Sequence, residues 1–152
     1  MNAGGRWLIA GGCLSALASA MHIAVIAGGA DWYRFFGAGE DMARAAERGS
    51  PMPAVVTLAI ATLLATWAAY AYSGAGRIRR LPLVRTALVI ISAIYLARGL
   101  LIVPVALFVP YPAGAFDYWS SLIVLVYGVV HAIGTAKAWP AMSRRALHER
   151  AA

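Results

Sequence analysis

The stretch Leu88-Val-Ile-Ile-Ser-Ala-Ile-Tyr-Leu-Ala-Arg-Gly-Leu-Leu-Ile-Val103 decides the fold, because it is a long apolar run that contains one arginine. With the apolar residues on either side it exceeds the roughly 20 residues that a bilayer-spanning helix needs. Placing the charge of Arg98 at the middle of such a helix costs about 2.5–3.5 kcal/mol, and a guanidinium does not lose its proton to avoid that cost. Arg98 therefore predicts a polar interior that supplies a partner, a water-filled cavity or an anionic ligand.

The composition supports a membrane protein. Of the 152 residues, 62% are hydrophobic and 12% are charged, whereas soluble domains carry about 25% charged residues. We therefore expect residues 1–152 to form a single integral membrane domain. The formal net charge is +7, but the basic residues cluster at the ends of apolar runs, so we expect no nucleic-acid partner. Cys13 is the only cysteine, which excludes an intramolecular disulfide and a CxxC motif.

Four apolar runs predict an all-α, four-helix transmembrane bundle. Lipid offers the backbone no hydrogen-bond partner, so each run must be a helix. The predicted spans are about 7–28, 54–72, 83–108 and 118–139, followed by a short basic tail at 140–152. The third span begins after Pro82, and Pro104 is expected to kink or stop it near its far end. We expect an extended turn at 109–114.

The first span imitates a secretory signal peptide. Arg6 precedes it, and Ala18-Ser19-Ala20 resembles a cleavage site. The apolar character continues through Ile26 to the length of a full span. We therefore expect an uncleaved first helix.

The segment between the first two spans, residues 31–50, differs from the other connections. It is about 25 residues long with its flanks, and it carries charges of both signs. Gly37 and Gly39 would each weaken a continuous helix by about 1 kcal/mol. Glu40 and Arg44 have the i,i+4 spacing of a helical ion pair. We expect an interfacial or re-entrant segment with a glycine bend, then a short helix that ends at Gly49.

The distribution of basic residues predicts the orientation. Arg77, Arg79 and Arg80 lie between the second and third spans, and Lys137, Arg144, Arg145 and Arg150 lie at the C-terminal end. The connection between the third and fourth spans has no Lys or Arg. The positive-inside rule therefore places both termini in the cytoplasm. We expect the protein to lie in the inner (plasma) membrane.

Polar and small residues recur at helical spacing in every predicted span. Most of them suit helix packing, since small residues allow close approach and hydroxyls bond across helices. The ionisable members need a stronger reason, because intramembrane His and Arg mark functional sites by default. Counting 1.5 Å per residue places His22 roughly 8–10 Å, Arg98 roughly 10–15 Å and His131 roughly 18–20 Å below the outer boundary.

These depths predict an intramembrane ligand site. His22 and Arg98 can face one another in the outer half. Glu40 and Asp117 are the nearest counter-ions for Arg98, and Glu40 completes a cluster if its loop folds inward. His131 forms a lower tier beneath Tyr127. The predicted ligand-binding residues are Arg98, His22, Glu40, Tyr95, Tyr127 and His131. Two other interpretations stay open, in which Arg98 snorkels to headgroups and His131 is a buried histidine bonded to a backbone carbonyl.

Haem and metal chemistry are weighed and disfavoured. A bis-histidine haem needs ligands at similar depth, whereas His22 and His131 differ by roughly 10 Å. A metal site built from these histidines and Glu40 has the right ligand types. It meets the same depth objection and lacks a local spacing such as HxxxH. The cofactor stays unknown, and no catalytic residue is predicted.

Two stretches carry a resemblance to a known family. Phe35-Phe-Gly-Ala-Gly-Glu40 follows the first helix, and Gly76-Arg-Ile-Arg-Arg-Leu-Pro82 forms a basic second loop. In layout and length the chain resembles small bacterial four-helix inner-membrane proteins of the DoxX-like type. That resemblance implies a four-helix membrane fold, and no site residue is carried over from it.

Three functions fit this pattern. The first is a binding or accessory membrane protein whose ligand is a lipid headgroup, a quinone or a small acid. The second is a small oligomeric transporter or proton-coupled channel, and the third is a haem or quinone redox subunit. A purely structural subunit is the simplest alternative. The expected partners are the lipid bilayer and either further copies of the chain or another membrane protein.

Overall fold

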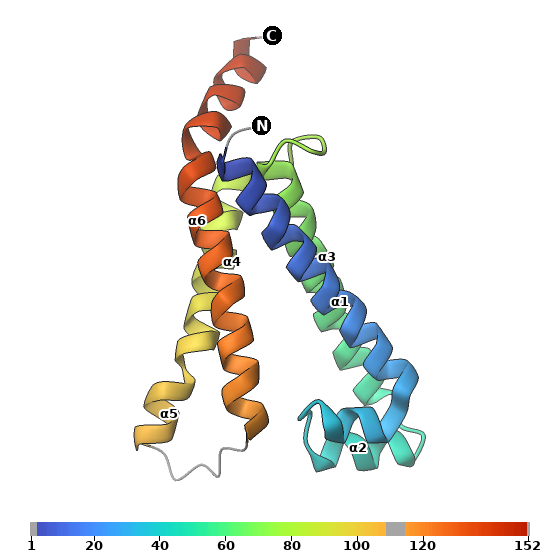
Figure 1. Ribbon diagram of the computed structural model, residues 1–152. Helices are drawn as coiled ribbons and strands as arrows, with labels where there is room; N and C mark the ends of the chain where they lie inside the picture. Colours follow the sequence, from blue (N-terminus) through green and yellow to red (C-terminus); the bar gives the residue numbers. More distant parts are fainter. Residues whose placement is uncertain (1–2, 109–114, 152) are drawn as a thin grey trace.

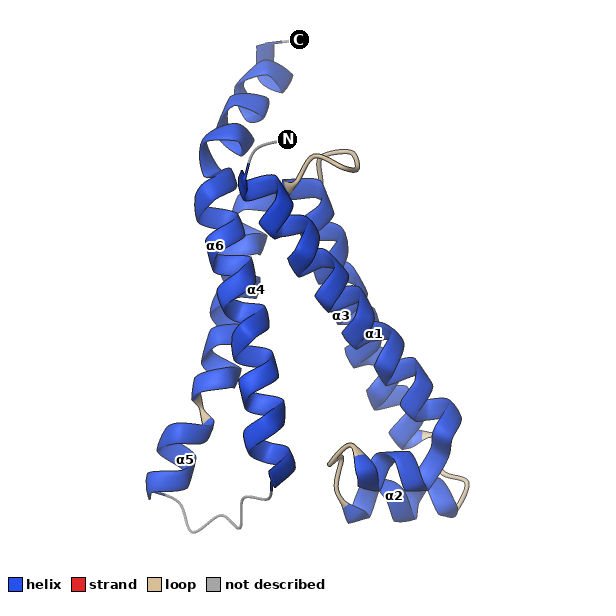
Figure 2. Ribbon diagram, in the orientation of Figure 1, coloured by secondary structure: helices blue, strands red, loops and turns tan. Residues whose placement is uncertain are grey.

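The computed structural model describes residues 3–108 and 115–151, and in this part of the chain every regular element is a helix (Figure 2). The turn predicted at 109–114 lies outside the described residues. The helices are α1 (Ala3–Phe35), α2 (Glu40–Glu47), α3 (Met52–Gly74), α4 (Val84–Leu100), α5 (Ile102–Phe108) and α6 (Ala115–Ala151). The predicted all-α fold with four long apolar helices, and a short helix between the first two, is confirmed.

Four helical segments are long and apolar enough to cross a membrane. They are Ala3–Phe35, Met52–Gly74, Val84–Val105 and Ala115–Ser143. Only 28% of each most apolar window is buried within the protein. Most apolar side chains therefore face outward, which suits lipid rather than water. The protein is a small multi-pass membrane protein that contacts the lipid bilayer.

The first and third spans differ from their predicted bounds for backbone reasons. α1 extends to Phe35 across a kink at Gly29, whose φ of 67° suits glycine. The third span is broken between α4 and α5 at Leu101. Pro104 explains this break, because a proline has no N–H for the carbonyl of Leu100 and its ring crowds that carbonyl. The predicted kink therefore lies about one turn before the proline.

The connection between α1 and α3 forms the predicted bend and short helix. Gly37 and Gly39 both have positive φ, of 67° and 96°, which turns the chain between α1 and α2. α2 packs back on α1 through Tyr33 and Ala43, which are buried with Val25. The Glu40–Arg44 ion pair forms as its spacing predicts, at 3.0 Å.

The four long helices are arranged as two pairs. α1 packs mainly on α3, and α4 packs mainly on α6, while α1 and α6 join the pairs. The two pairs meet at the end that holds both chain termini and diverge toward the end that holds α2 and α5 (Figure 1). This arrangement separates a packed end of the molecule from an end where the pairs are apart.

Glycines allow the helices to approach closely. A Cβ added at Gly99 would lie 2.7 Å from the Leu125 Cα, so α4 and α6 touch through their backbones. A Cβ at Gly134 would lie 3.0 Å from the Leu8 backbone nitrogen, which is the equivalent contact between α6 and α1. Small residues at such crossings are typical of membrane helices, where van der Waals contact drives association.

Candidate functional site

A buried hydrogen-bonded network joins the two helix pairs. Ser15 of α1 lies 3.0 Å from the Tyr95 hydroxyl of α4 and 3.4 Å from Nε2 of His131 on α6. Ser15 and His131 are fully buried, and Tyr95 is 5% exposed. Each of the three side chains therefore comes from a different helix, and the network forms where the pairs meet.

The direction of these hydrogen bonds follows from one carbonyl. His131 Nδ1 lies 2.9 Å from the backbone oxygen of Tyr127, which can only accept, so Nδ1 carries a proton. In a neutral imidazole Nε2 then accepts from the Ser15 hydroxyl, and Ser15 accepts from Tyr95. Protonation of Nε2 would reverse both bonds. The network is thus a continuous chain whose polarity depends on one proton.

Aromatic rings surround this network. The Tyr95 ring lies 4.8 Å from Trp67, 5.7 Å from Tyr127 and 5.2 Å from His131, centroid to centroid. Ala18 of α1 packs against the same cluster, so all four long helices contribute to this layer. Tyr127 is partly exposed. Within the described residues its hydroxyl makes no hydrogen bond, and its backbone oxygen accepts from His131.

His22 lies beyond this layer on α1. Its Nδ1 donates to the backbone oxygen of Ala18, one turn back, at 2.8 Å. His22 is seven residues after Ser15, or about 10 Å along the helix toward α2. The imidazoles of His22 and His131 are therefore at different levels, as the depth count predicts.

Arg98 also lies beyond the layer, on α4 and three residues after Tyr95. Its Nη1 donates to the Ser121 hydroxyl of α6 at 3.1 Å, and Ser121 is 1% exposed. Arg98, Ser121 and Asp117 line a small hollow of about 140 Å³ between these helices. The guanidinium therefore has a buried polar partner, which is one of the ways to accommodate its charge that the sequence predicts.

Glu40 lies apart from Arg98, in α2. Arg34 donates to both of its carboxylate oxygens, at 3.0 and 3.2 Å, and Arg44 donates at 3.0 Å. Arg34 also reaches Glu47 at 2.7 Å. The structure thus brings Tyr95, Tyr127 and His131 together, and it does not bring Glu40 to His22 or Arg98. Through its ion pair with Arg34, Glu40 instead connects α2 to the C-terminal end of α1.

The carboxyl group of Glu40 is expected to titrate abnormally. The hydrogen bonds from Arg34, and then those from Arg44, lower the pKa of Glu40 from its ordinary 4.5 to about 2. Because the folded pKa is depressed, these bonds stabilise the fold fully above about pH 4.5 and are lost as the pH falls through about 2. A carboxyl-carbon NMR titration in micelles should give a midpoint near 2. Arg34→Gln should raise that midpoint, and an ordinary midpoint in the unmodified protein would contradict the observed geometry.

Two residues of the site were not predicted as such. Ser15 belongs to the small-residue stripe of the first span, and its spacing to Ser19 does place it on one face with His22. No local sequence pattern predicts the contact of Ser15 with His131, because the two residues lie on different helices. The same holds for the contact of Ser121 with Arg98. No group of three or more His, Cys, Asp or Glu residues suited to a metal occurs among the side chains that the structure describes, which end at Ser143 in α6.

Comparisons with known proteins give no family for this chain. No family model, curated protein or solved structure matches it. The resemblance to the DoxX-like type therefore stays a prediction.

Proposed function

We propose that this small membrane protein binds a hydrogen-bonding or anionic ligand within the membrane, where its two helix pairs begin to diverge. The lipid headgroup, quinone and small acid predicted from the sequence all have the required chemistry. The protein acts in this proposal as a binding or accessory protein. The observation that carries it is the buried Ser15–Tyr95–His131 network. The Tyr127 ring contacts Tyr95, and its hydroxyl makes no hydrogen bond within the described part of the chain.

The position of the remaining polar residues supports the proposal. Tyr127 precedes His131 by one helical turn, Arg98 follows Tyr95 by about one turn, and His22 follows Ala18 by one turn. Each step leads toward the end where the pairs diverge (Figure 1). A ligand beside Tyr127 on that side of the aromatic layer would have the imidazole of His22 and the guanidinium of Arg98 about one helical turn beyond Ala18 and Tyr95. Arg98 would pair with an anionic or carbonyl oxygen.

A thermal-shift comparison tests this site. The probes are a short-chain quinone, a short-chain phosphatidylglycerol and lactate, each added to the purified full-length protein. A probe at about 100 times its Kd stabilises the folded protein by about 2.7 kcal/mol, which raises Tm by about 5–11 °C for a domain of about 150 residues. Tyr127→Phe should reduce the shift. Tyr118→Phe, at an exposed position on the same helix, should leave the shift unchanged. Equal shifts in both variants would contradict the assignment of Tyr127.

Transport is the second function that an observation favours. The pairs converge at one end and diverge at the other (Figure 1), and the Tyr95–Ser15–His131 chain joins the two pairs between these ends. Such a chain can pass a proton if His131 changes its protonation. Proteoliposomes should then show solute or proton flux that His131→Leu abolishes. The redox alternative predicts instead a coloured protein.

We also propose that both termini face the cytoplasm of the inner membrane. The loop with Arg77, Arg79 and Arg80 lies at the same end of the molecule as the termini (Figure 1), which supports this orientation.

Cysteine labelling measures the orientation. The background is Cys13→Ser, and single cysteines replace Ala38 or Ile78, both of which are exposed. A membrane-impermeant maleimide added to intact cells should label the Ala38→Cys protein. The Ile78→Cys protein should react only after lysis. The opposite pattern would reverse the proposed orientation.

A further inference from the structure

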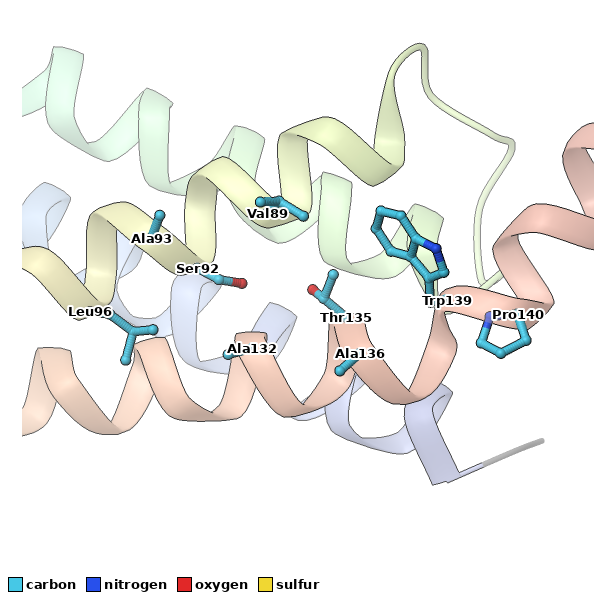
Figure 3. A pocket seen from close by; sticks show the side chains of 9 residues that line it. All are labelled: Val89, Ser92, Ala93, Leu96, Ala132, Thr135, Ala136, Trp139 and Pro140. Atoms are coloured by element: carbon cyan, nitrogen blue, oxygen red, sulfur yellow. The ribbon is translucent and has the colours of Figure 1, made fainter.

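A groove runs between α4 and α6 near the end that holds the termini. It has a volume of about 640 Å³, within the range of about 300–1,000 Å³ that is typical of small-molecule sites. Alanines at 132 and 136 leave the space open, and Leu96 and Trp139 border it (Figure 3). From Ala132 to Pro140 the groove follows α6 for about 12 Å. Its length and apolar lining suit part of an acyl chain.

One wall of the groove holds an unused hydroxyl. Thr135 is 5% exposed, and its buried Oγ1 has no hydrogen-bond partner in the part of the chain that the structure describes. Ser92, across the groove, donates to the Leu88 carbonyl at 2.7 Å instead. Figure 3 shows both side chains pointing into the space between the helices. A buried hydroxyl without a partner is unfavourable, so the groove fits a ligand that brings an acceptor oxygen.

The end of the groove carries positive charge. The guanidinium carbon of Arg85 lies 3.9 Å from the centre of the Trp139 ring, and Trp139 lines the groove. Arg85 Nε is buried and has no partner among the described side chains and backbone. Tryptophan is typical of the headgroup level of a membrane. An anionic group bound beside Trp139 would be attracted to the positive charge of the Arg85 guanidinium.

We propose that this groove binds one anionic phospholipid. An acyl chain lies along Ala132 and Ala136, an ester oxygen accepts from Thr135, and the phosphate lies beside Arg85. Basic pockets between membrane helices are typical sites for anionic headgroups. The groove is formed by α4 and α6 alone, so this lipid site is separate from the ligand site proposed at Tyr127.

Native mass spectrometry of the delipidated full-length protein tests the proposal. The probes are dioleoyl phosphatidylglycerol and dioleoyl phosphatidylcholine, which share their chains and differ in charge. The unmodified protein should bind one phosphatidylglycerol per chain, preferred about fivefold. Arg85→Gln should remove that preference. Thr135→Val should lower the binding affinity for both lipids about threefold. Ala136→Leu should abolish the binding of both lipids.

Each variant has a matched control away from the groove. The controls are Arg48→Gln for the charge, Thr66→Val for the hydroxyl and Ala20→Leu for the volume, all at exposed positions. Equal binding of the two lipids, or groove variants that behave as their controls, would overturn the proposal. A dimer that dissociates with Ala136→Leu while lipid binding is unchanged would assign the groove to a second copy of the chain and overturn it too.

A second measurement uses the fluorescence of Trp139, which lines the groove. Brominated acyl chains quench nearby tryptophan, so brominated phosphatidylglycerol should quench Trp139 more than brominated phosphatidylcholine does. The difference between the unmodified protein and Trp139→Phe isolates this residue. Equal quenching by the two lipids would contradict an anionic-lipid site.

Discussion

Replacing Gly99 by valine should destabilise the protein by about 3 kcal/mol, because overpacking a tight contact costs about 1–3 kcal/mol and occasionally more. A Cβ at Gly99 would lie 2.7 Å from the Leu125 Cα, and a backbone atom cannot turn away as a side chain does. The substitution therefore separates α4 from α6. Valine is also the better helix former, so a net loss of stability must come from the helix contact.

The measurement is reversible unfolding in mixed micelles with increasing denaturing detergent. Ala97→Val is the matched control, because Ala97 is exposed on the same helix. An exposed substitution should change the free energy of unfolding by about 0.5 kcal/mol or less. Equal effects at 97 and 99 would show that the two helices do not touch at Gly99.

Replacing His131 by alanine should destabilise the protein by about 3 kcal/mol, since removal of a large buried side chain costs about 2–5 kcal/mol. His131 is fully buried and packs beside Gly11, where a Cβ would lie 2.9 Å from its ring. The substitution also removes the bonds to Ser15 and to the Tyr127 carbonyl. Hydrogen bonds within membranes average about 0.6 kcal/mol, so the cavity is the larger cause.

His22→Ala is the control for this prediction. His22 is only partly buried and bonds within its own helix, to Ala18. We expect it to cost about 1 kcal/mol or less. A double-mutant cycle between Ser15→Ala and His131→Ala should give a coupling of about 0.6–1.7 kcal/mol. No coupling, or equal losses for the two histidines, would contradict the network that joins the helix pairs.

Local sequence could predict the helices but not which helices pair. The length of an apolar run predicts a spanning helix, because lipid offers unpaired backbone groups no hydrogen-bond partner. The i,i+4 spacing predicts the ion pair between Glu40 and Arg44. Helical spacing also places Tyr127 and His131 on one face. No such rule connects residues of separate helices, because a register error of one turn moves a side chain by about 5 Å.

Arg98 shows where this limit matters. The sequence offers Glu40 and Asp117 as the nearest counter-ions, and neither lies inside a predicted span, so a direct pair requires a loop to fold inward. The structure gives it the Ser121 hydroxyl on α6, while Glu40 is held by Arg34. Ser121 is one of several serines in the apolar runs, and its role depends on how α4 packs on α6. Only the three-dimensional arrangement supplies that information.

The most direct test of a ligand site between the helix pairs is to purify the full-length protein in mild detergent, record its absorption spectrum and extract the same sample for mass spectrometry. The account predicts a colourless protein that carries one enriched lipid, quinone or small acid, which Tyr127→Phe and Arg98→Ala release. A Soret band would make the protein a haem subunit. A colourless protein with nothing enriched besides the phospholipid of the α4–α6 groove would contradict the proposed site. So would an enriched molecule other than that phospholipid which both variants retain as fully as the unmodified protein does.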